Sequence, residues 1–555
     1  MRRHHRSTRA LLGVVAAATL VLAGCSGGGV TAASDPNVLT VGMPNGPQTN
    51  NNNPFLPTSA SSSLGYRYMI YETLAQLNMI KPEEEPTPWL AESWEWSPDY
   101  TKITFTTRSG VTWSDGEAFS AADVAYTFTL LRDVTALNFN GLPVASATAT
   151  GDDTAEVTFT KPQFVNQWKI FQTTVVPEHV WSKVPDPATF TDEKPVGTGP
   201  YALKTFTPQT VALTVRDQYW QDLPEVPELQ YTSYNDNSAQ TTALANGTSQ
   251  WSYVFMPNYE RLFIAEDPAN HKLWYPSGLG IHGLWFNTSR APFDDVAVRR
   301  AVNDVIDRET IFVQGESKLY PKIDSLTGLP SPAGDSFLAP EFADAKHVVD
   351  VERAKQRLAA AGYTLDGDVL KDGSGDPVTF TLTNPAGWSD YLTDLDIVKN
   401  SVKQLGITAE VRTQTVEQWT TDFTSGEFDA SMRWTNTGAT PYEIYSNVMD
   451  GSQNKPVGEV AASTFGRFDD AEATQALADY AAALDDGARA TALATLQKIM
   501  VEQVPMVPTS AGPLGAEYNQ KHWVGWPSPE DPYAPPQPTQ PNALQIVLKL
   551  KPANG

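Results

Sequence analysis

Side chains that carry out catalysis or bind metals are sparse in this chain, and their spacing forms no familiar site. The chain has 555 residues and seven histidines. No two histidines show the i, i+4 spacing of a helical zinc site, and the HExxH motif is missing. His271 and His282 lie eleven residues apart and could meet in the fold, but we expect each to be a lone surface or core histidine. The sequence therefore predicts no metal site and no cofactor.

Motifs for nucleophilic chemistry and phosphate binding are also missing, including the GxSxG nucleophile elbow and the P-loop. Two pairs of neighbouring carboxylates stand where helices are expected to begin, and the helix dipole already favours acids there. A glycosidase would need two facing carboxylates about 5–10 Å apart, so a secreted glycosidase is the rival enzyme hypothesis. We expect a protein that is not an enzyme. The carboxylate pairs are Asp294-Asp295 and Asp469-Asp470.

The only cysteine, Cys25, follows a segment with the features of a secretory signal peptide. Residues 1–9 carry four arginines and no acid, and residues 10–23 carry no charge at all. This apolar stretch is too short to cross the roughly 30 Å hydrocarbon layer comfortably as a helix. A buried core helix is the alternative, but a basic flank at the start of the chain has no role in a core. The sequence predicts a signal peptide over residues 1–24.

The segment Leu22-Ala23-Gly24-Cys25 resembles the bacterial lipobox, in which the cysteine is lipidated and becomes the first residue after cleavage. The resemblance implies a diacylglyceryl anchor on Cys25, and two acyl chains hold a protein stably at a membrane. Residues 25–36 are rich in glycine and serine and then form a flexible tether. We therefore expect an extracytoplasmic protein anchored to the outer face of the cell membrane.

Composition and charge limit the class of protein further. Hydrophobic residues make up 41% of the chain and charged residues 19%, as in ordinary globular proteins. The length predicts several domains, or one large domain with inserted lobes. The formal net charge of −25 repels phosphate backbones, so we expect no binding to nucleic acid.

The local patterns indicate an α/β protein with breaks between its parts. Residues 155–160 alternate like a half-buried strand, and Ser120 is placed to cap a helix with Asp123 in its first turn. The cluster 197–200 (Gly-Thr-Gly-Pro) predicts a lobe boundary. From Pro292 onward, helices alternate with strands, which is typical of an α/β fold. Further helices are expected from about 351 to 361, 469 to 485 and 487 to 502.

Several stretches, taken in order, resemble the extracellular solute-binding proteins of family 5, which serve importers driven by ATP-binding cassettes. Each stretch is weak alone, but together they span about residues 38–550 and are specific. The family handles oligopeptides, dipeptides, nickel complexes and some oligosaccharides. The matching stretches are 89–94 (WLAESW), 111–116 (VTWSDG), 195–201 (PVGTGPY), 286–288 (FNT), 291–302 (APFDDVAVRRAV) and 426–430 (GEFDA).

The resemblance implies a two-lobed fold of the periplasmic-binding-protein type, class II, with a subdomain inserted in the first lobe. The first lobe would comprise residues 37–80, 198–285 and 505–555, and the inserted subdomain residues 81–197. The second lobe would comprise residues 286–504. A discontinuous first lobe requires at least two chain crossings between the lobes, which form a hinge.

The resemblance also points to residues that would contact a ligand held between the lobes. In peptide-binding members an acidic residue shortly after the second tryptophan of the pattern receives the peptide amino group. Here the residues after Trp434 contain no acid until Glu443. The run from Trp434 to Tyr442 resembles the oligosaccharide-binding branch instead. The predicted ligand-binding residues are Trp434, Asn436, Trp419, Trp251, Phe255, Tyr442 and Trp388.

Sugar chemistry suits these side chains. The apolar face of a pyranose packs on a flat indole without needing charge, and its hydroxyls pair with neutral amides such as that of Asn436. We therefore expect a solute-binding protein for a small oligomer, with a neutral oligosaccharide as the favoured ligand and an oligopeptide as the alternative. The implied partner is a membrane-embedded ABC permease, and the expected state is a monomer.

Overall fold

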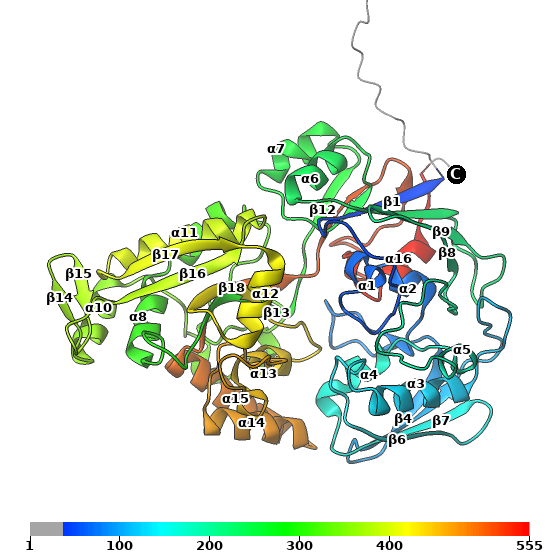
Figure 1. Cartoon of the computed structure of the whole chain (residues 1–555), viewed down its shortest axis with the longest axis horizontal. Coiled ribbons are helices and arrows are strands. Elements are labelled where there is room, and N and C mark those ends of the chain that lie inside the picture. The colour runs from blue at the N-terminus through cyan, green and yellow to red at the C-terminus, as the bar shows by residue number, and fades with distance from the viewer. Residues whose placement is uncertain (1–36, 554–555) are drawn as a thin grey trace, which may run out of the picture. The chain divides into compact units, whose positions relative to one another are not determined.

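The computed structural model describes residues 37–553, which form an α/β fold around two large sheets (Figure 1). The predicted signal peptide, the tether and Cys25 lie outside the described residues. Within the described range, no helix is long and apolar enough to span a bilayer.

The first lobe is built on a mixed seven-stranded sheet. We use this name for the part of the chain around the strands ordered β12-β20-β11-β1-β10-β9-β8. β1 lies at its centre, where it pairs in parallel with both β10 and β11. The strands are β1 (Val38–Met43), β8 (Tyr201–Phe206), β9 (Thr210–Val215), β10 (Glu228–Ser233), β11 (Trp251–Ser252), β12 (His271–Trp274) and β20 (Ala516–Asn519).

Short helices and ribbons complete this lobe. The helices are α1 (Ala60–Leu64), α2 (Arg67–Ile70), α6 (Asn237–Ala245), α7 (Tyr259–Leu262) and α16 (Ala543–Lys549). The ribbons are β2 (Ala75–Gln76) with β3 (Thr87–Pro88), and β21 (Trp523–Val524) with β22 (Lys551–Pro552). Near the chain end, α16 is helical, and its buried residues Ala543, Leu544, Ile546 and Val547 follow the helical repeat.

The inserted subdomain carries its own antiparallel sheet, ordered β4-β5-β7-β6, with α3 beside it in Figure 1. The predicted cap of α3 is confirmed: the Ser120 hydroxyl accepts from the helix start, and the Asp123 carboxylate accepts from the Ser120 N–H, a capping box. The elements are β4 (Ala91–Trp96), β5 (Lys102–Thr107), α3 (Ala121–Asp133), β6 (Val144–Ala149), β7 (Thr154–Phe159), α4 (Gln167–Phe171) and α5 (Glu178–Trp181).

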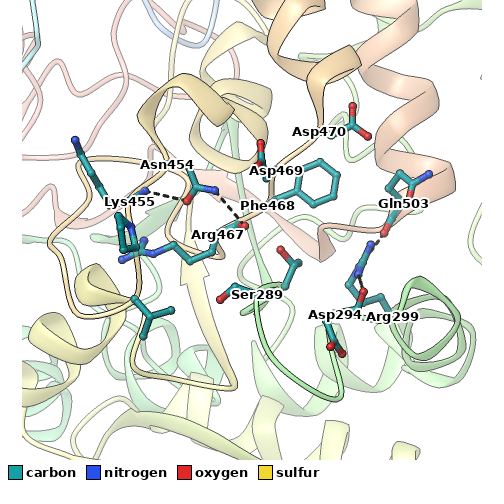
Figure 2. Close-up of a pocket in the computed structure, with 13 residues that line it drawn as sticks. Ser289, Asp294, Arg299, Asn454, Lys455, Arg467, Phe468, Asp469, Asp470 and Gln503 are labelled. Carbon is teal, nitrogen blue, oxygen red and sulfur yellow. Dashed lines mark hydrogen bonds between the residues drawn. The ribbon is translucent and has the colours of Figure 1, made fainter. Parts of the chain in front are cut away.

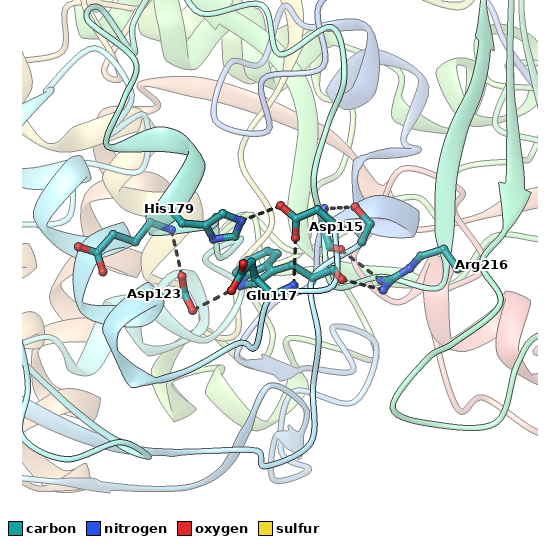
Figure 3. Close-up of polar contacts among 9 residues, drawn as sticks. Asp115, Glu117, Asp123, His179 and Arg216 are labelled. Carbon is teal, nitrogen blue, oxygen red and sulfur yellow. Dashed lines mark hydrogen bonds and ion pairs between the residues drawn. The ribbon is translucent and has the colours of Figure 1, made fainter.

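Polar contacts fasten the inserted subdomain to the first lobe (Figure 3). The Arg216 guanidinium donates to the carbonyls of Gly197, Thr198 and Gly199 and also to that of Trp113. The predicted breaker cluster is therefore held by one half-buried cation, Arg216. Nearby, His179 Nε2 lies 2.7 Å from the Asp115 carboxylate.

The second lobe is built on a five-stranded sheet ordered β17-β16-β18-β13-β19. Its strands are β13 (Ser277–Phe286), β16 (Thr379–Pro385), β17 (Thr408–Gln414), β18 (Ala430–Trp434) and β19 (Met506–Pro513), with a small ribbon of β14 (Thr364–Asp366) and β15 (Val369–Lys371). Its helices are α8 (Val296–Val305), α9 (Arg308–Thr310), α10 (Val351–Ala360), α11 (Ser389–Lys403), α12 (Val416–Ser425), α13 (Tyr442–Met449), α14 (Ala471–Ala482) and α15 (Asp486–Gln503).

The helix expected from Pro292 begins later. Asp295 is the N-cap of α8, and its carboxylate accepts from the Ala297 N–H, so residues 292–295 precede the helix. The helix expected to end before Gly362 is confirmed as α10, and Gly362 takes a positive φ of 94° that suits glycine.

The chain passes from the first sheet to the second between β12 and β13 and returns between β19 and β20. The two crossings contact each other, because the Leu514 N–H donates to the Pro276 carbonyl over 2.9 Å. Since β13 and β19 lie wholly in the second sheet, we propose lobe boundaries at 276 and 514 rather than at 285 and 505.

Gly515 is required by the close approach of the two crossings. A Cβ at this position would lie 2.3 Å from Cγ of Tyr275. We expect Gly515→Ala to lower the free energy of unfolding by roughly 1–3 kcal/mol, as overpacked substitutions do. Urea unfolding measures this, with Gly373→Ala as the control because its Cβ would meet nothing within 4 Å. Equal midpoints for the two variants would show that the crossings are loosely packed.

Candidate ligand-binding site

Three predicted tryptophans, Trp388, Trp419 and Trp434, come together in the second lobe. Their ring centroids lie 5.0, 5.8 and 6.1 Å apart in the three pairings. Trp419 is buried on α12, and its indole N–H donates to the Ser431 hydroxyl over 2.8 Å. Trp434, at the end of β18, is 39% exposed. Trp434 therefore offers an open indole face that the other two rings support from behind.

From this cluster a run of aromatic rings continues to the crossing between the lobes. Trp388 contacts Tyr391 at 5.9 Å between centroids, and the Tyr391 hydroxyl lies 3.0 Å from His282 Nδ1. His282 in turn contacts Tyr320 at 5.2 Å. Burial lowers the pKa of His282 to about 4, so its imidazole is neutral at physiological pH. These aromatic rings thus connect the second lobe to the place where the chain crosses between the lobes. The histidine among them, His282, is uncharged.

The first lobe supplies the far end of the same run. Tyr320 lies 6.0 Å from Tyr275 and 6.1 Å from Phe255 between ring centroids, and Tyr253 stacks on Tyr275 at 6.0 Å. Phe255, a predicted ligand residue, is buried among these rings, whereas Tyr253 is partly exposed. Rings from both lobes therefore meet around Tyr320.

The remaining predicted residues lie in different surroundings. Trp251 is fully buried in the core of the first lobe, where its indole N–H donates to the Pro536 carbonyl over 2.8 Å. Trp251 therefore has no surface to offer a ligand, and its predicted role in binding is wrong for this arrangement of the chain. Tyr442 stacks on Tyr480 at 5.7 Å and is partly exposed. Asn436 is exposed next to Trp434, and its backbone N–H donates to the Asn447 amide oxygen.

Glu443, the first acid after Trp434, is already paired. Its carboxylate lies 2.8 Å from the Lys169 ammonium, which comes from α4 of the inserted subdomain. The Glu443 side chain is 3% exposed and that of Lys169 is 15% exposed, so water screens this ion pair little. The Glu443 carboxylate thus already pairs with the Lys169 ammonium and is not free to pair with the ammonium group of a ligand.

Arg433 differs from Glu443, because aromatic rings surround its guanidinium and no carboxylate among the described residues pairs with it. Its carbon Cζ lies 4.4 Å from the Phe465 centroid, 4.6 Å from that of Phe423 and 5.3 Å from that of Trp434. Among the described residues, nothing pairs with its buried Nε and Nη1. Burial lowers the pKa of Arg433 to about 10, which leaves it charged, and the ring faces partly stabilise that charge.

These elements match a known protein family. The model for the bacterial extracellular solute-binding proteins, family 5 (middle region), matches residues 85–456, more than half of the chain. The chain belongs to this family. Heme-binding protein A of Haemophilus influenzae is 25% identical over 537 residues, which cover 89% of this chain and 92% of that protein. The nickel-binding periplasmic protein of Escherichia coli is 24% identical over 61% of this chain and 64% of its own length.

Solved structures of the same fold include several two-lobed binding proteins. A periplasmic oligopeptide-binding protein of an ABC transporter from Thermotoga maritima has a TM-score of 0.84 at 22% identity, covering 94% of this chain and 100% of that one. Its crystal structure with bound mannohexaose gives 0.81 at 22% identity, covering 93% and 99%. The oligopeptide-binding protein AppA of Bacillus subtilis, in complex with a nonapeptide, gives 0.75 at 20% identity, covering 92% and 98%.

A separate hollow of about 390 Å³ on this family 5 protein is lined by charged and polar side chains (Figure 2). Arg299 in its wall donates to the carbonyls of Phe293 and Gln503, and Arg467 donates to that of Thr424. These contacts within the protein engage both arginines that line the hollow. Among the described residues, no cluster of histidines, cysteines or acids is placed to hold a metal ion.

Sequence reasoning missed Lys169, Arg433, Tyr320 and Tyr391. Arg433 directly precedes Trp434 on β18, but successive side chains of a strand point to opposite faces, so adjacency alone did not predict that the guanidinium lies beside the indole. The other three reach the site only through the fold, and Lys169 comes from a different subdomain.

Buried carboxyl groups near the crossing make stability depend on pH. Burial raises the pKa of Glu517 from 4.5 to about 8, and hydrogen bonds from the Tyr275 hydroxyl and the Val254 N–H offset this only in part. The folded protein then keeps a proton that the unfolded chain releases above pH 4.5. The free energy of unfolding therefore falls as pH rises from about 4.5 to 8.

We expect Glu517→Gln to reduce this decline by roughly 2–4 kcal/mol, because the amide stays neutral at every pH. Urea unfolding at pH 5 and pH 8 measures it. Glu341→Gln, which changes an exposed acid, is the control and should keep the wild-type decline. An unchanged decline in Glu517→Gln would mean that Glu517 is ionised in the folded protein at neutral pH.

Proposed function

We propose that this family 5 solute-binding protein captures a neutral oligosaccharide and delivers it to an ABC permease. The observation that carries the proposal is Trp434, an exposed indole supported by Trp388 and Trp419. A pyranose ring packs its apolar face on such a surface and buries area without a charge partner. The exposed amide of Asn436 next to it offers a neutral donor and acceptor for hydroxyls.

The charge arrangement also supports a sugar over a free peptide. A peptide ammonium enclosed by protein needs an acidic partner, because an unpaired buried charge is costly. Glu443 already holds Lys169. The Thermotoga maritima protein of the same fold was solved with mannohexaose, so this fold accommodates an oligosaccharide.

An oligopeptide is the second candidate, and Asp390 favours it. This carboxyl begins α11 and is buried next to the aromatic run. Burial raises the pKa of Asp390 to about 6, and the N–H groups at the helix start oppose that rise. At neutral pH it carries charge that a ligand ammonium could neutralise.

We further propose that Cys25 carries a lipid anchor, which would hold the protein outside the cell next to its permease. The support is the lipobox-like segment 22–25 and the apolar segment before it. Mass spectrometry of the membrane-extracted protein tests this, with Cys25→Ala as the unlipidated control.

The ligand proposal is tested by calorimetry with cello- and manno-oligosaccharides of two to six units against a mixture of di- to hexapeptides. We expect a sugar to bind and Trp434→Ala to lose roughly 1–3 kcal/mol of binding free energy, as truncated hot-spot aromatics do. Phe139→Ala removes an aromatic that is 74% exposed in the inserted subdomain and should leave binding unchanged.

If a peptide binds at micromolar affinity and no sugar shows binding, the oligosaccharide proposal is wrong and the oligopeptide is favoured. Chromatography of the same sugars after incubation tests the glycosidase hypothesis. A binding protein leaves them intact, whereas cleavage products would assign an enzyme.

A further inference from the structure

One helical turn in the inserted subdomain, α4, presents three side chains to one side. At roughly 100° per residue, Trp168, Lys169 and Gln172 fall within one face of the turn. Ile170 and Phe171 point away from that face and are buried in the core of the first lobe. The Leu74 N–H donates to the Phe171 carbonyl, which fixes the turn to the lobe.

Lys169 shows where this face points. Its ammonium lies 2.8 Å from the Glu443 carboxylate on α13 and 5.3 Å from the centroid of the Trp168 ring. The Trp168 indole is therefore close to the segment that follows Trp434. Just before α4, Arg489 of α15 stacks on Phe164 at 3.8 Å, which is a second contact between this segment and the second lobe.

Two hydrogen-bond donors on this face have no partner among the residues that the structure describes. The indole Nε1 of Trp168 and the amide Nε2 of Gln172 are buried, and neither finds an acceptor among the described residues. A buried donor without a partner destabilises a fold, so native structures leave few of them unexplained. Here two occur four residues apart on the same face, next to the proposed site. Both are neutral N–H donors, which suit the hydroxyl and ring oxygens of a sugar.

We propose that Trp168 and Gln172 form the wall of the ligand site that the inserted subdomain provides, and that they donate hydrogen bonds to ligand oxygens. That these oxygens belong to a sugar rests on the proposed function. The Lys169–Glu443 ion pair holds this wall against the second lobe beside the loop after Trp434. Ligand oxygens thereby supply the acceptors that the protein itself lacks.

The test uses Trp168→Phe, which keeps a ring but removes the N–H, and Gln172→Met, which keeps the length but removes the donor. Calorimetry with the tightest-binding cello- or manno-oligosaccharide should show each variant weakened about 5- to 100-fold, the range expected for one lost partner of a buried donor. The matched control is Trp96→Phe, because its indole Nε1 on β4 is also buried without a partner among the described residues, and its ring packs on Tyr100 and Phe159, neither of which belongs to α4. It should bind like wild type, and thermal unfolding verifies that all three variants fold.

The outcomes separate this inference from the proposed function. If the wild-type protein binds the sugar and both Trp168→Phe and Gln172→Met bind it with the same affinity, then Trp168 and Gln172 do not contact the ligand. The proposal that the ligand is a sugar is unaffected by that result. If only a peptide binds wild type, the sugar is overturned. The wall then predicts the same weakening toward the peptide, whose carbonyl oxygens are also acceptors, and unchanged peptide affinity would overturn it. Equal weakening in Trp96→Phe would also overturn it, since the effect would not be local to α4.

Discussion

The passage of the chain between its two sheets is the constraint on which the rest of the molecule depends. Residues 275–276 and 514–515 make the two crossings, and a hydrogen bond from Leu514 to Pro276 holds them together. The aromatic run reaches the first lobe at Tyr275, on one of these crossings. A change in the angle between the lobes must therefore alter the packing of the rings that lie beside the proposed ligand site.

Charge in this region is arranged by burial more than by pairing. Arg433 stays charged among ring faces, whereas Glu517 keeps a proton because it is buried. Glu443 and Lys169 neutralise each other in a place that water hardly reaches. The proposed site thus combines ring surfaces with few free charges, which is the environment that a polar but uncharged ligand requires.

The sequence predicted elements whose signals are local and missed contacts that arise from distant segments. The capping box of Ser120 and Asp123 and the glycine at 362 set helix ends through their immediate neighbours, so both were predictable. The helix start predicted at Pro292 is wrong, because the N-cap of α8 is Asp295, three residues later. The sequence alone does not distinguish Trp251 from Trp434, although Trp251 lies in the core and Trp434 lies on the surface. Lys169 could not be connected with Glu443 from spacing, because only the fold brings α4 to α13.

The ion pair between α4 and α13 has a consequence for signalling to the permease. Both partners belong to the protein, so the contact can form without a solute group. The contact by itself therefore does not require bound solute. Any distinction between empty and loaded molecules must come from groups that bind solute in one arrangement of the lobes and not in the other.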